Sequence, residues 1–137
     1  MAQKLTLELV TPVKQVLSET VDEITAPGTM GQFGVLPGHT PMLTTLEVGE
    51  LCYRKGDQTY YVAVNWGYVE IEDDRVIILV ETAEAEDDID LNRAKVALGR
   101  AEKALAEMSA EEKQYMIMQQ ALARALARIQ VASRKAR

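Results

Sequence analysis

The chain has 137 residues, with 15 lysines and arginines against 21 aspartates and glutamates, so its formal net charge is −6. Residues 1–88 carry 5 basic and 16 acidic side chains, a net of −11, whereas residues 89–137 carry 10 basic and 5 acidic ones, a net of +5. The composition is 47% hydrophobic, which excludes a disordered chain, and no apolar run approaches the roughly 20 residues that span a bilayer. The composition and charge change near residues 82–90, which predicts two units, residues 1–86 and residues 87–137.

Cys52 is the only cysteine and His39 the only histidine. An internal disulfide and a cysteine-based metal cluster are therefore excluded, and a catalytic triad or zinc site would have to be built around His39 alone. We expect Cys52 to be a small buried hydrophobe and His39 to be structural or part of an interface, so an enzyme is the weakest functional class. The N-terminal sequence has no apolar signal core and no transit character, which indicates a cytosolic or matrix-like compartment.

The first unit has the pattern of short β-strands. Leu5, Leu7 and Leu9 alternate with polar residues, as in a half-buried strand. Pro27-Gly28 is expected to end a second strand, and two further pairs of strands flank turn sequences at 55–58 and 73–74. The expected strands cover residues 5–9, 21–26, 51–54, 59–64, 68–72 and 75–81. This spacing predicts a small β-sandwich or barrel.

The second unit has the pattern of two helices, each with one narrow apolar face. Ser109 and Glu112 form a capping-box sequence between them, and the short connection predicts an antiparallel hairpin. The alanines of these faces permit close approach but bury little area, so the hairpin could separate from its partner surface without unfolding the rest. The expected contact positions are Leu91, Ala94, Leu98, Ala101, Leu105 and Met108 on the first helix, and Tyr115, Met118, Leu122, Ala125, Ile129 and Ala132 on the second.

Two motifs have structural explanations that we favour. The glycines at 28, 31, 34 and 38 resemble a phosphate cradle, but the Gly-Lys-Ser/Thr ending is missing, so turns in a β domain explain them better. The acidic run at 87–90 could hold a cation, but acidic residues before a helix more often cap it.

Four arginines are expected to line one flank of the hairpin. On a helical wheel, Arg93 and Arg100 lie to one side of the first apolar face, and Arg124 and Arg128 lie on the same side of the second. Only Arg93 has an acidic residue, Asp90, three or four positions away. Such a cluster could bind an anion such as phosphate, could be a solvated basic face, or could face the acidic first unit.

Three stretches carry a family resemblance over nearly the whole chain. They are Gly31-Gln-Phe-Gly-Val-Leu-Pro-Gly-His-Thr-Pro41, Val64-Asn-Trp-Gly-Tyr-Val-Glu70 and Ile89-Asp-Leu-Asn-Arg-Ala94. With them the chain resembles the ε subunit of bacterial F-type ATP synthase. The resemblance implies an N-terminal β-sandwich followed by a C-terminal antiparallel two-helix hairpin, in a non-catalytic rotor subunit at the cytoplasmic face of the bacterial inner membrane. The mitochondrial counterpart looks similar, and the missing transit peptide favours the bacterial one.

The resemblance also implies partners and a switch. The sandwich would bind the shaft subunit γ and the ring of membrane c subunits, with Gly31, Gln32, Phe33 and His39 at that interface. Gln32 stands where many relatives carry glutamate. The hairpin would alternate between a folded form and an extended form that inhibits ATP hydrolysis by the α/β hexamer. A basic stripe would then meet an acidic β-subunit loop, and it consists of Arg124, Arg128, Arg134, Lys135 and Arg137.

In some relatives ATP, with or without Mg²⁺, acts as a regulatory ligand that holds the hairpin folded, and no cofactor is required. The matching motif here is Ile89-Asp90-x-x-Arg93-Ala94. The resemblance places Glu84 and Ile89 at the base, Asp90, Arg93 and Ala94 in the motif that orients the nucleotide, and Arg100, Arg124 and Arg128 at the phosphates. An alternative is a nucleotide sensor whose hairpin stays folded. A nucleic-acid-binding module is disfavoured by the acidic first unit and by the lack of aromatic platforms on the hairpin.

Overall fold

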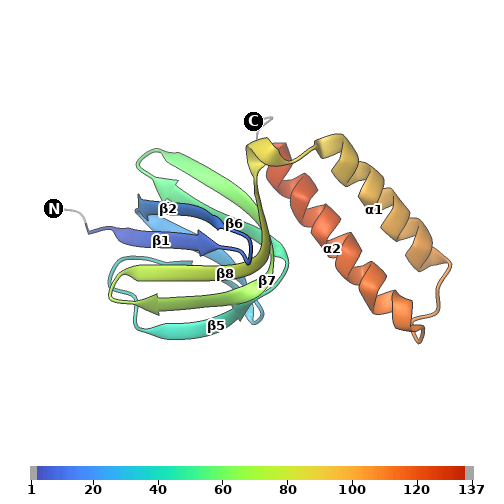
Figure 1. The fold of residues 1–137 in the computed structure, drawn as a ribbon, viewed down its shortest axis with the longest axis horizontal. Helices are drawn as coiled ribbons and strands as arrows, with labels where there is room; N and C mark the ends of the chain where they lie inside the picture. Colours follow the sequence, from blue (N-terminus) through green and yellow to red (C-terminus); the bar gives the residue numbers. More distant parts are fainter. Residues whose placement is uncertain (1–2, 135–137) are drawn as a thin grey trace.

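A computed structural model of the chain describes residues 3–134, and the structural statements below refer to those residues. Eight strands are followed by a short 3-10 helix and two α-helices, with the hairpin standing beside one end of a β-sandwich (Figure 1). The fold class predicted from the sequence is confirmed. The elements are β1 (Leu5–Val10), β2 (Gln15–Val21), β3 (Glu23–Gly28), β4 (Gly31–Val35), β5 (Met42–Leu46), β6 (Gly49–Lys55), β7 (Gln58–Glu72), β8 (Arg75–Ala85), η1 (Glu86–Asp88), α1 (Leu91–Ala106) and α2 (Lys113–Arg134).

The sandwich is one sheet that folds over on itself. Its order is β2-β1-β8-β7-β5-β3-β4, and β6 pairs with β3 and β7. Residues 58–64 of β7 pair with β6 and residues 67–71 pair with β5, so this strand passes from one layer to the other near Asn65 and Trp66. The alternating leucines of β1 are fully buried, as their period of two predicts, and lie at the centre of the core.

Three strands were missed, and one boundary was wrong. β2, β4 and β5 are strands that the sequence pattern did not predict, and the segments expected at 59–64 and 68–72 form the single strand β7. Pro27 lies within β3, opposite Gln32, and does not end the strand. The glycine-rich segment at 31–35 forms β4, because an edge strand with one buried residue, Val35, tolerates glycines that a central strand would not.

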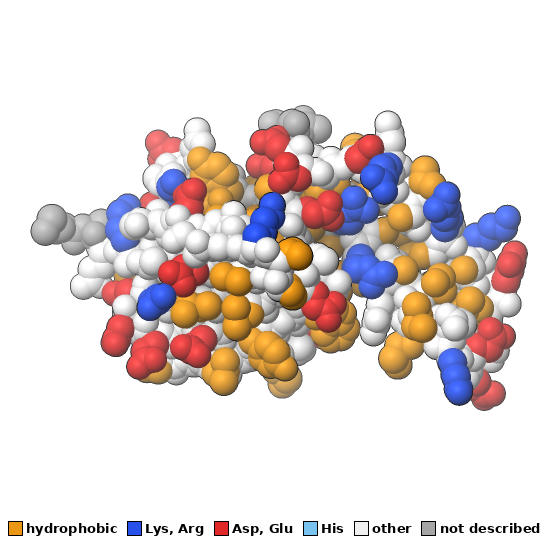
Figure 2. Space-filling view, in the orientation of Figure 1, with side chains coloured by type: hydrophobic (Ala, Val, Ile, Leu, Met, Phe, Trp, Pro, Cys, Tyr) orange, Lys and Arg blue, Asp and Glu red, His pale blue; other side chains and the backbone are white. Residues whose placement is uncertain are grey.

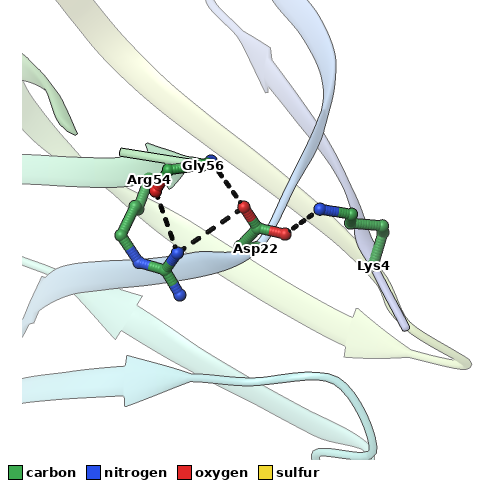
Figure 3. Close-up of polar contacts among 4 residues, drawn as sticks. All are labelled: Lys4, Asp22, Arg54 and Gly56. Carbon is green, nitrogen blue, oxygen red and sulfur yellow. Dashed lines mark hydrogen bonds and ion pairs between the residues drawn. The ribbon is translucent and has the colours of Figure 1, made fainter. Parts of the chain in front are cut away.

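A carboxylate ties three parts of the sandwich together (Figure 3). Asp22, between β2 and β3, accepts hydrogen bonds from Nζ of Lys4 and, at 2.7 Å, from the backbone N–H of Gly56, and it lies 3.6 Å from NH1 of Arg54. The Lys4 hydrogen bond, followed by that of Gly56, lowers the pKa of Asp22 below its ordinary value of 3.8. The start of β1 and the β6–β7 turn are therefore held at one point.

α1 begins at its expected cap, whereas α2 begins at Lys113, four positions after the expected cap Ser109. The Asp90 carboxylate accepts from the backbone N–H of Arg93 at 3.1 Å, so the acidic run before α1 supplies its N-cap. The carboxylate of Glu112 accepts from the backbone N–H of Ser109 at 3.4 Å, and Oγ of Ser109 accepts from Glu111 at 3.3 Å. The capping sequence thus forms its bonds in the turn just before α2, which begins at Lys113.

The hairpin has the antiparallel arrangement that was predicted, but α2 buries a second face. Ala94 and Ala101 of α1 and Ala125 and Ala132 of α2 are buried at expected contact positions. Val131 is fully buried although it lies off that face. The reason is that α2 also packs on β6 and β7, with α1 on its far side (Figure 1).

The contact between the two units is small. Ala63 of β7 packs with Ile89, Val131 and Ala132, and Tyr61 and Leu91 border this cluster. Few large apolar side chains take part, so burial alone stabilises the folded hairpin modestly. Within residues 3–134, no helix is long and apolar enough to cross a membrane.

Candidate functional site

The C-terminal end of α2 is held on the sandwich by an arginine. Nε and NH2 of Arg134 donate to the two carboxylate oxygens of Glu50 on β6, at 3.0 and 2.7 Å. The guanidinium carbon also lies 4.6 Å from the ring centroid of Tyr61 on β7. The Glu50 hydrogen bonds raise the pKa of Arg134 above its ordinary value, so the guanidinium stays charged near neutral pH. We call Glu50, Tyr61 and Arg134 the anchor.

A second ion pair joins α2 to β8. Nε of Arg128 lies 2.8 Å from Oε1 of Glu84, and NH2 donates to Oε2 at 3.4 Å. Nε is buried and makes no hydrogen bond of good geometry within the described residues, although it makes this ion pair. The Glu84 carboxylate therefore offsets the charge of Arg128 and is the partner of its buried Nε. Arg128 and Arg134 thus contact acidic side chains of the sandwich. For Arg128, this is the arrangement in which the basic flank faces the acidic first unit and does not bind an anion.

The structure places the eight nucleotide-site residues on β8, before and along α1, and on α2, and does not gather them all at the interface between the units. Glu84 and Arg128 are in direct contact, Asp90 caps α1, and Ile89 and Ala94 are buried. Arg93 and Arg100 are exposed on α1, and Arg124 is half-buried on α2. No ion pair is found for these three arginines within residues 3–134. Figure 2 shows several basic side chains on the visible face of the hairpin, near its junction with the sandwich.

A groove runs between the sandwich and α2, with a volume of about 970 Å³. Its sandwich wall includes Asn65 and Trp66, and its hairpin wall includes Gln120 and Arg124. The space-filling view shows the surface hollowed between the two units (Figure 2). Arg124 is the one residue of the expected nucleotide set that lines this groove.

The residues expected at the stalk interface lie on β4 and in the loop after it. Gly31 has a φ of +121°, Gln32 is exposed, and Phe33 packs against the core. The His39 loop is tied to the β7–β8 turn, because the backbone N–H of Gly38 donates to Oδ1 of Asp74 at 2.7 Å. Nδ1 of His39 donates to the carbonyl oxygen of Thr40 at 2.7 Å.

The sequence patterns missed two exposed apolar features of the sandwich. Met30, at the tip of the β3–β4 hairpin, is 97% exposed and adjoins Gly31. Tyr68 and Leu79 lie directly opposite each other on the outer face of β7 and β8, and Leu43 on β5 is exposed on the same face. The unbroken apolar run at 76–80 was the available signal, because such a run is typical of a strand covered on both faces.

Three of the five residues of the basic stripe lie within the part of the chain that the structure describes. Arg124, Arg128 and Arg134 lie along α2, and two of them contact the sandwich. Lys135 and Arg137 lie outside the described residues.

No group of three histidine, cysteine or acidic side chains that could hold a metal ion is found in the described part of the chain.

Comparison with known families gives two adjoining matches. Residues 4–86 match the model described as ATP synthase, Delta/Epsilon chain, beta-sandwich domain. Residues 87–133 match the model described as ATP synthase, Delta/Epsilon chain, long alpha-helix domain. Together the two models cover nearly all of the chain.

Similar curated proteins carry one description. The chain is 68% identical to ATP synthase epsilon chain 2 of Syntrophotalea carbinolica over 137 residues, which is 100% of this chain and 99% of the relative. It is 61% identical to the ATP synthase epsilon chain of Geobacter sulfurreducens over the same shares of both chains.

Two of the solved structures with this fold are of mitochondrial assemblies. A chain of the Euglena gracilis mitochondrial ATP synthase, in a structure of OSCP, F1 and c-ring, superposes with a TM-score of 0.80 at 24% identity, over 97% of this chain and 81% of that one. A chain of the Tetrahymena thermophila mitochondrial ATP synthase, in a structure of central stalk and c-ring, gives 0.56 at 16% identity, over 98% of both chains. At these identities the likeness concerns the fold alone.

Proposed function

Because the chain belongs to the ATP synthase delta/epsilon family, we propose that it is a non-catalytic rotor subunit that couples rotation of the c-ring to the catalytic hexamer and restrains ATP hydrolysis through its hairpin. The family and the epsilon-chain relatives support the rotor assignment. We place the subunit at the cytoplasmic face of the bacterial inner membrane, attached through the complex. The proposed units are residues 1–86 for the stalk and ring contacts, and residues 87–137 for regulation.

The observation that carries the regulatory part is the use of two stripe arginines as contacts to the sandwich. Arg128 pairs with Glu84 and Arg134 pairs with Glu50 while the hairpin is folded. The proposed inhibitory form needs the same guanidinium groups for an acidic surface of the β subunit. The two sets of contacts exclude each other, so the folded hairpin withholds its inhibitory residues.

The ring contact is proposed for the β3–β4 tip and the loop that ends at His39. Gly31, Gln32 and Phe33 lie at or near this tip, and the exposed Met30 offers an apolar side chain beside them. The shaft subunit γ is proposed to cover the outer face at Tyr68 and Leu79, since such exposed apolar side chains mark interaction surfaces.

The test of this function is hydrolysis by a reconstituted assembly of the α/β hexamer and γ. Added full-length chain is expected to lower the ATPase rate, and the double variant Arg124→Gln/Arg128→Gln is expected to inhibit less, because the stripe has lost two charges. Arg75→Gln is the matched control, since Arg75 of β8 pairs with Glu8 of β1 on the surface of the sandwich. An unchanged rate with the intact chain would overturn the regulatory part of the proposal and leave the coupling part standing.

The alternative function is an ATP sensor, which the unpaired arginines favour. Arg93, Arg100 and Arg124 make no ion pair in the described part of the chain. Phosphate oxygens could accept from these groups, so ATP, with or without Mg²⁺, would be a regulatory ligand. Calorimetry with ATP is expected to show binding that Arg93→Ala or Arg124→Ala removes and that Lys95→Ala, an exposed control on α1, retains. Absence of heat at millimolar ATP would eliminate the sensor.

A further inference from the structure

α2 is fastened to the sandwich near its C-terminal end. Arg128 and Arg134 make ion pairs with sandwich glutamates, and Val131 packs against Ala63 of β7. Figure 1 shows this end of α2 against the sandwich and the start of the helix farther from it. The groove of about 970 Å³ lies between the first half of the helix and the sandwich. Rotation of α2 about its fastened end would therefore narrow the groove.

The first half of α2 has an apolar face toward this groove. Gln120 and Arg124 line it, and Arg128, four positions further on, contacts the sandwich. Met116 lies four positions before Gln120, and Ile117 lies seven before Arg124, so both continue the same face toward the start of the helix. Met116 is 66% exposed and Ile117 is 50% exposed. Rotation of α2 toward the sandwich would cover both side chains.

The sandwich wall of the groove has exposed apolar side chains as well. Trp66, Tyr68 and Leu79 line this wall and are 39%, 57% and 49% exposed. Closing the groove would remove the apolar surfaces of both walls from water, which is favourable in proportion to the area buried.

The same wall contains a buried amide without a partner. Asn65 is 8% exposed, and its fully buried Oδ1 accepts no hydrogen bond within the described residues. A buried acceptor without a donor destabilises the state in which it occurs. The side-chain amide of Gln120 lies on the facing wall and carries two N–H donors. A closed groove could therefore give Asn65 the donor that it lacks.

Two opposite charges also line the two walls. Arg124 belongs to the hairpin wall and Glu81 to the sandwich wall, and neither makes an ion pair within residues 3–134. The other two arginines of the basic stripe within this range each pair with a glutamate of the sandwich. Glu81 is thus the carboxylate across the groove from the one arginine of these three that has no such partner.

We propose that α2 closes this groove in the free chain, so that Arg124 pairs with Glu81, Gln120 donates to Asn65, and the apolar side chains of the two walls cover each other. The 12 positions from Arg128 back to Met116 span about 18 Å at about 1.5 Å per residue, so a rotation of roughly 15° brings Met116 about 5 Å closer to the sandwich.

Closure adds a third contact that withholds the basic stripe. In the closed form Arg124, Arg128 and Arg134 all pair with sandwich carboxylates, so none of the three is available to an acidic partner. This consequence rests on the proposed function, whereas the closure itself is a property of the free chain.

The test is the distance between spin labels at Glu70 and Lys113, two exposed positions on β7 and at the start of α2. It is measured on the full chain in a Cys52→Ser background, without γ or nucleotide. The distance distribution is expected to contain, beside the distance that the structure gives, a component about 5 Å shorter that reports the closed groove.

Variants identify the contacts of the closed form. Glu81→Gln is expected to lower the ratio of closed to open groove about fivefold, because the ion pair is lost. Asn65→Leu is expected to lower it by about the same factor, because the open form no longer contains an unpaired acceptor. Arg124→Glu should remove the short component, and the exchanged pair Arg124→Glu/Glu81→Arg should restore it. Glu47→Gln, at an exposed position outside the groove, is the control.

The outcomes separate this inference from the proposed function. Absence of the short component in the otherwise wild-type chain would overturn the closure, as would a short component that neither Glu81→Gln nor Asn65→Leu reduces. Failure of the exchanged pair to restore it would overturn the pairing of Arg124 with Glu81. Each of these results leaves the rotor assignment standing. Absence of inhibition by the intact chain in the hydrolysis test would instead overturn the regulatory consequence and leave the closure standing.

Discussion

Arg134 at the end of α2 and Glu50 on β6 lie 84 positions apart in the chain and share two hydrogen bonds, at 3.0 and 2.7 Å. Glu50 is 12% exposed as a side chain and Arg134 is 23% exposed, so the pair is shielded from water more than a surface ion pair. Because the apolar contact beside it is small, we expect this pair to contribute strongly to holding the hairpin on the sandwich.

The first prediction concerns hairpin opening. Glu50→Gln is expected to lower the free energy of the folded hairpin relative to the open one by about 1–3 kcal/mol, which is a 5- to 150-fold change in the equilibrium. The measurement is the distance between spin labels at Thr20 and Lys103, two exposed positions on the sandwich and on α1, in a Cys52→Ser background. The distance distribution should gain a long component.

The control for this experiment is Arg75→Gln. It removes an arginine–glutamate pair of 3.2 Å that joins β8 to β1, far from the hairpin. If Arg75→Gln opens the hairpin as much as Glu50→Gln does, a general loss of charge and not the anchor controls the opening.

The second prediction compares two glycines. A β-carbon on Gly67 would lie 1.9 Å from the carbonyl oxygen of Leu79, whereas one on Gly99 would meet nothing within 4 Å. Gly67→Ala is therefore expected to cost more than about 3 kcal/mol in the free energy of unfolding, while Gly99→Ala, inside α1, should add about 0.5–1 kcal/mol. Urea denaturation followed by circular dichroism measures both changes. Similar unfolding midpoints for the two variants would show that β7 and β8 approach less closely than this.

The third prediction concerns acid stability. The pKa of Asp22 is lowered in the folded chain, chiefly by its hydrogen bond from Lys4, so the folded state binds a proton less readily than the unfolded one. The contribution of Asp22 to the free energy of unfolding is complete above the ordinary pKa of 3.8. It is lost as the pH falls through the lower pKa that Asp22 has in the folded chain. Asp22→Asn should lower the melting temperature at pH 7 and reduce its slope below about pH 4. Parallel melting curves for wild type and Asp22→Asn across this range would contradict the assignment.

The fourth prediction separates two roles of Asp90. Asparagine is as good an N-cap as aspartate, while alanine costs about 1 kcal/mol. Asp90→Asn is therefore expected to retain the melting temperature of the hairpin, and Asp90→Ala to lower it. Calorimetry on the same pair tests the nucleotide role, because ATP affinity should fall in Asp90→Asn if the charge orients the ligand. Unchanged ATP binding in Asp90→Asn would show that the charge of Asp90 has no role in nucleotide binding and that the residue serves only as the N-cap of α1.

The elements that could be predicted from the sequence are those with local signals. The alternation at Leu5, Leu7 and Leu9, the capping residues Asp90 and Ser109, and the small residues between the helices all act through neighbours a few positions away. β5 lacks such a pattern, because it is a short strand whose pairing is fixed by β7, a partner more distant in the chain. β4 pairs with the adjacent strand β3, but its glycines hide the alternation of a strand.

The candidate site was predictable only in part for the same reason. The wheel grouped Arg128 with three other arginines on one flank of the hairpin but could not show that Glu84, 44 positions earlier, pairs with it. The groove was missed because it needs two walls from separate units and a strand bend at Trp66. An unpaired amide cannot be recognised before the strands on both sides of it are placed.

If the folded hairpin withholds inhibitory arginines, ATP hydrolysis by the reconstituted hexamer–γ assembly must change when the anchor is broken. Glu50→Gln releases Arg134 without removing any charge from the basic stripe, so the ATPase rate with this variant is predicted to fall below the rate with the wild-type chain. Arg134→Gln opens the hairpin but weakens the stripe and should inhibit less than Glu50→Gln. Equal ATPase rates for wild type and Glu50→Gln, in samples whose label distances show an opened hairpin, would contradict the account.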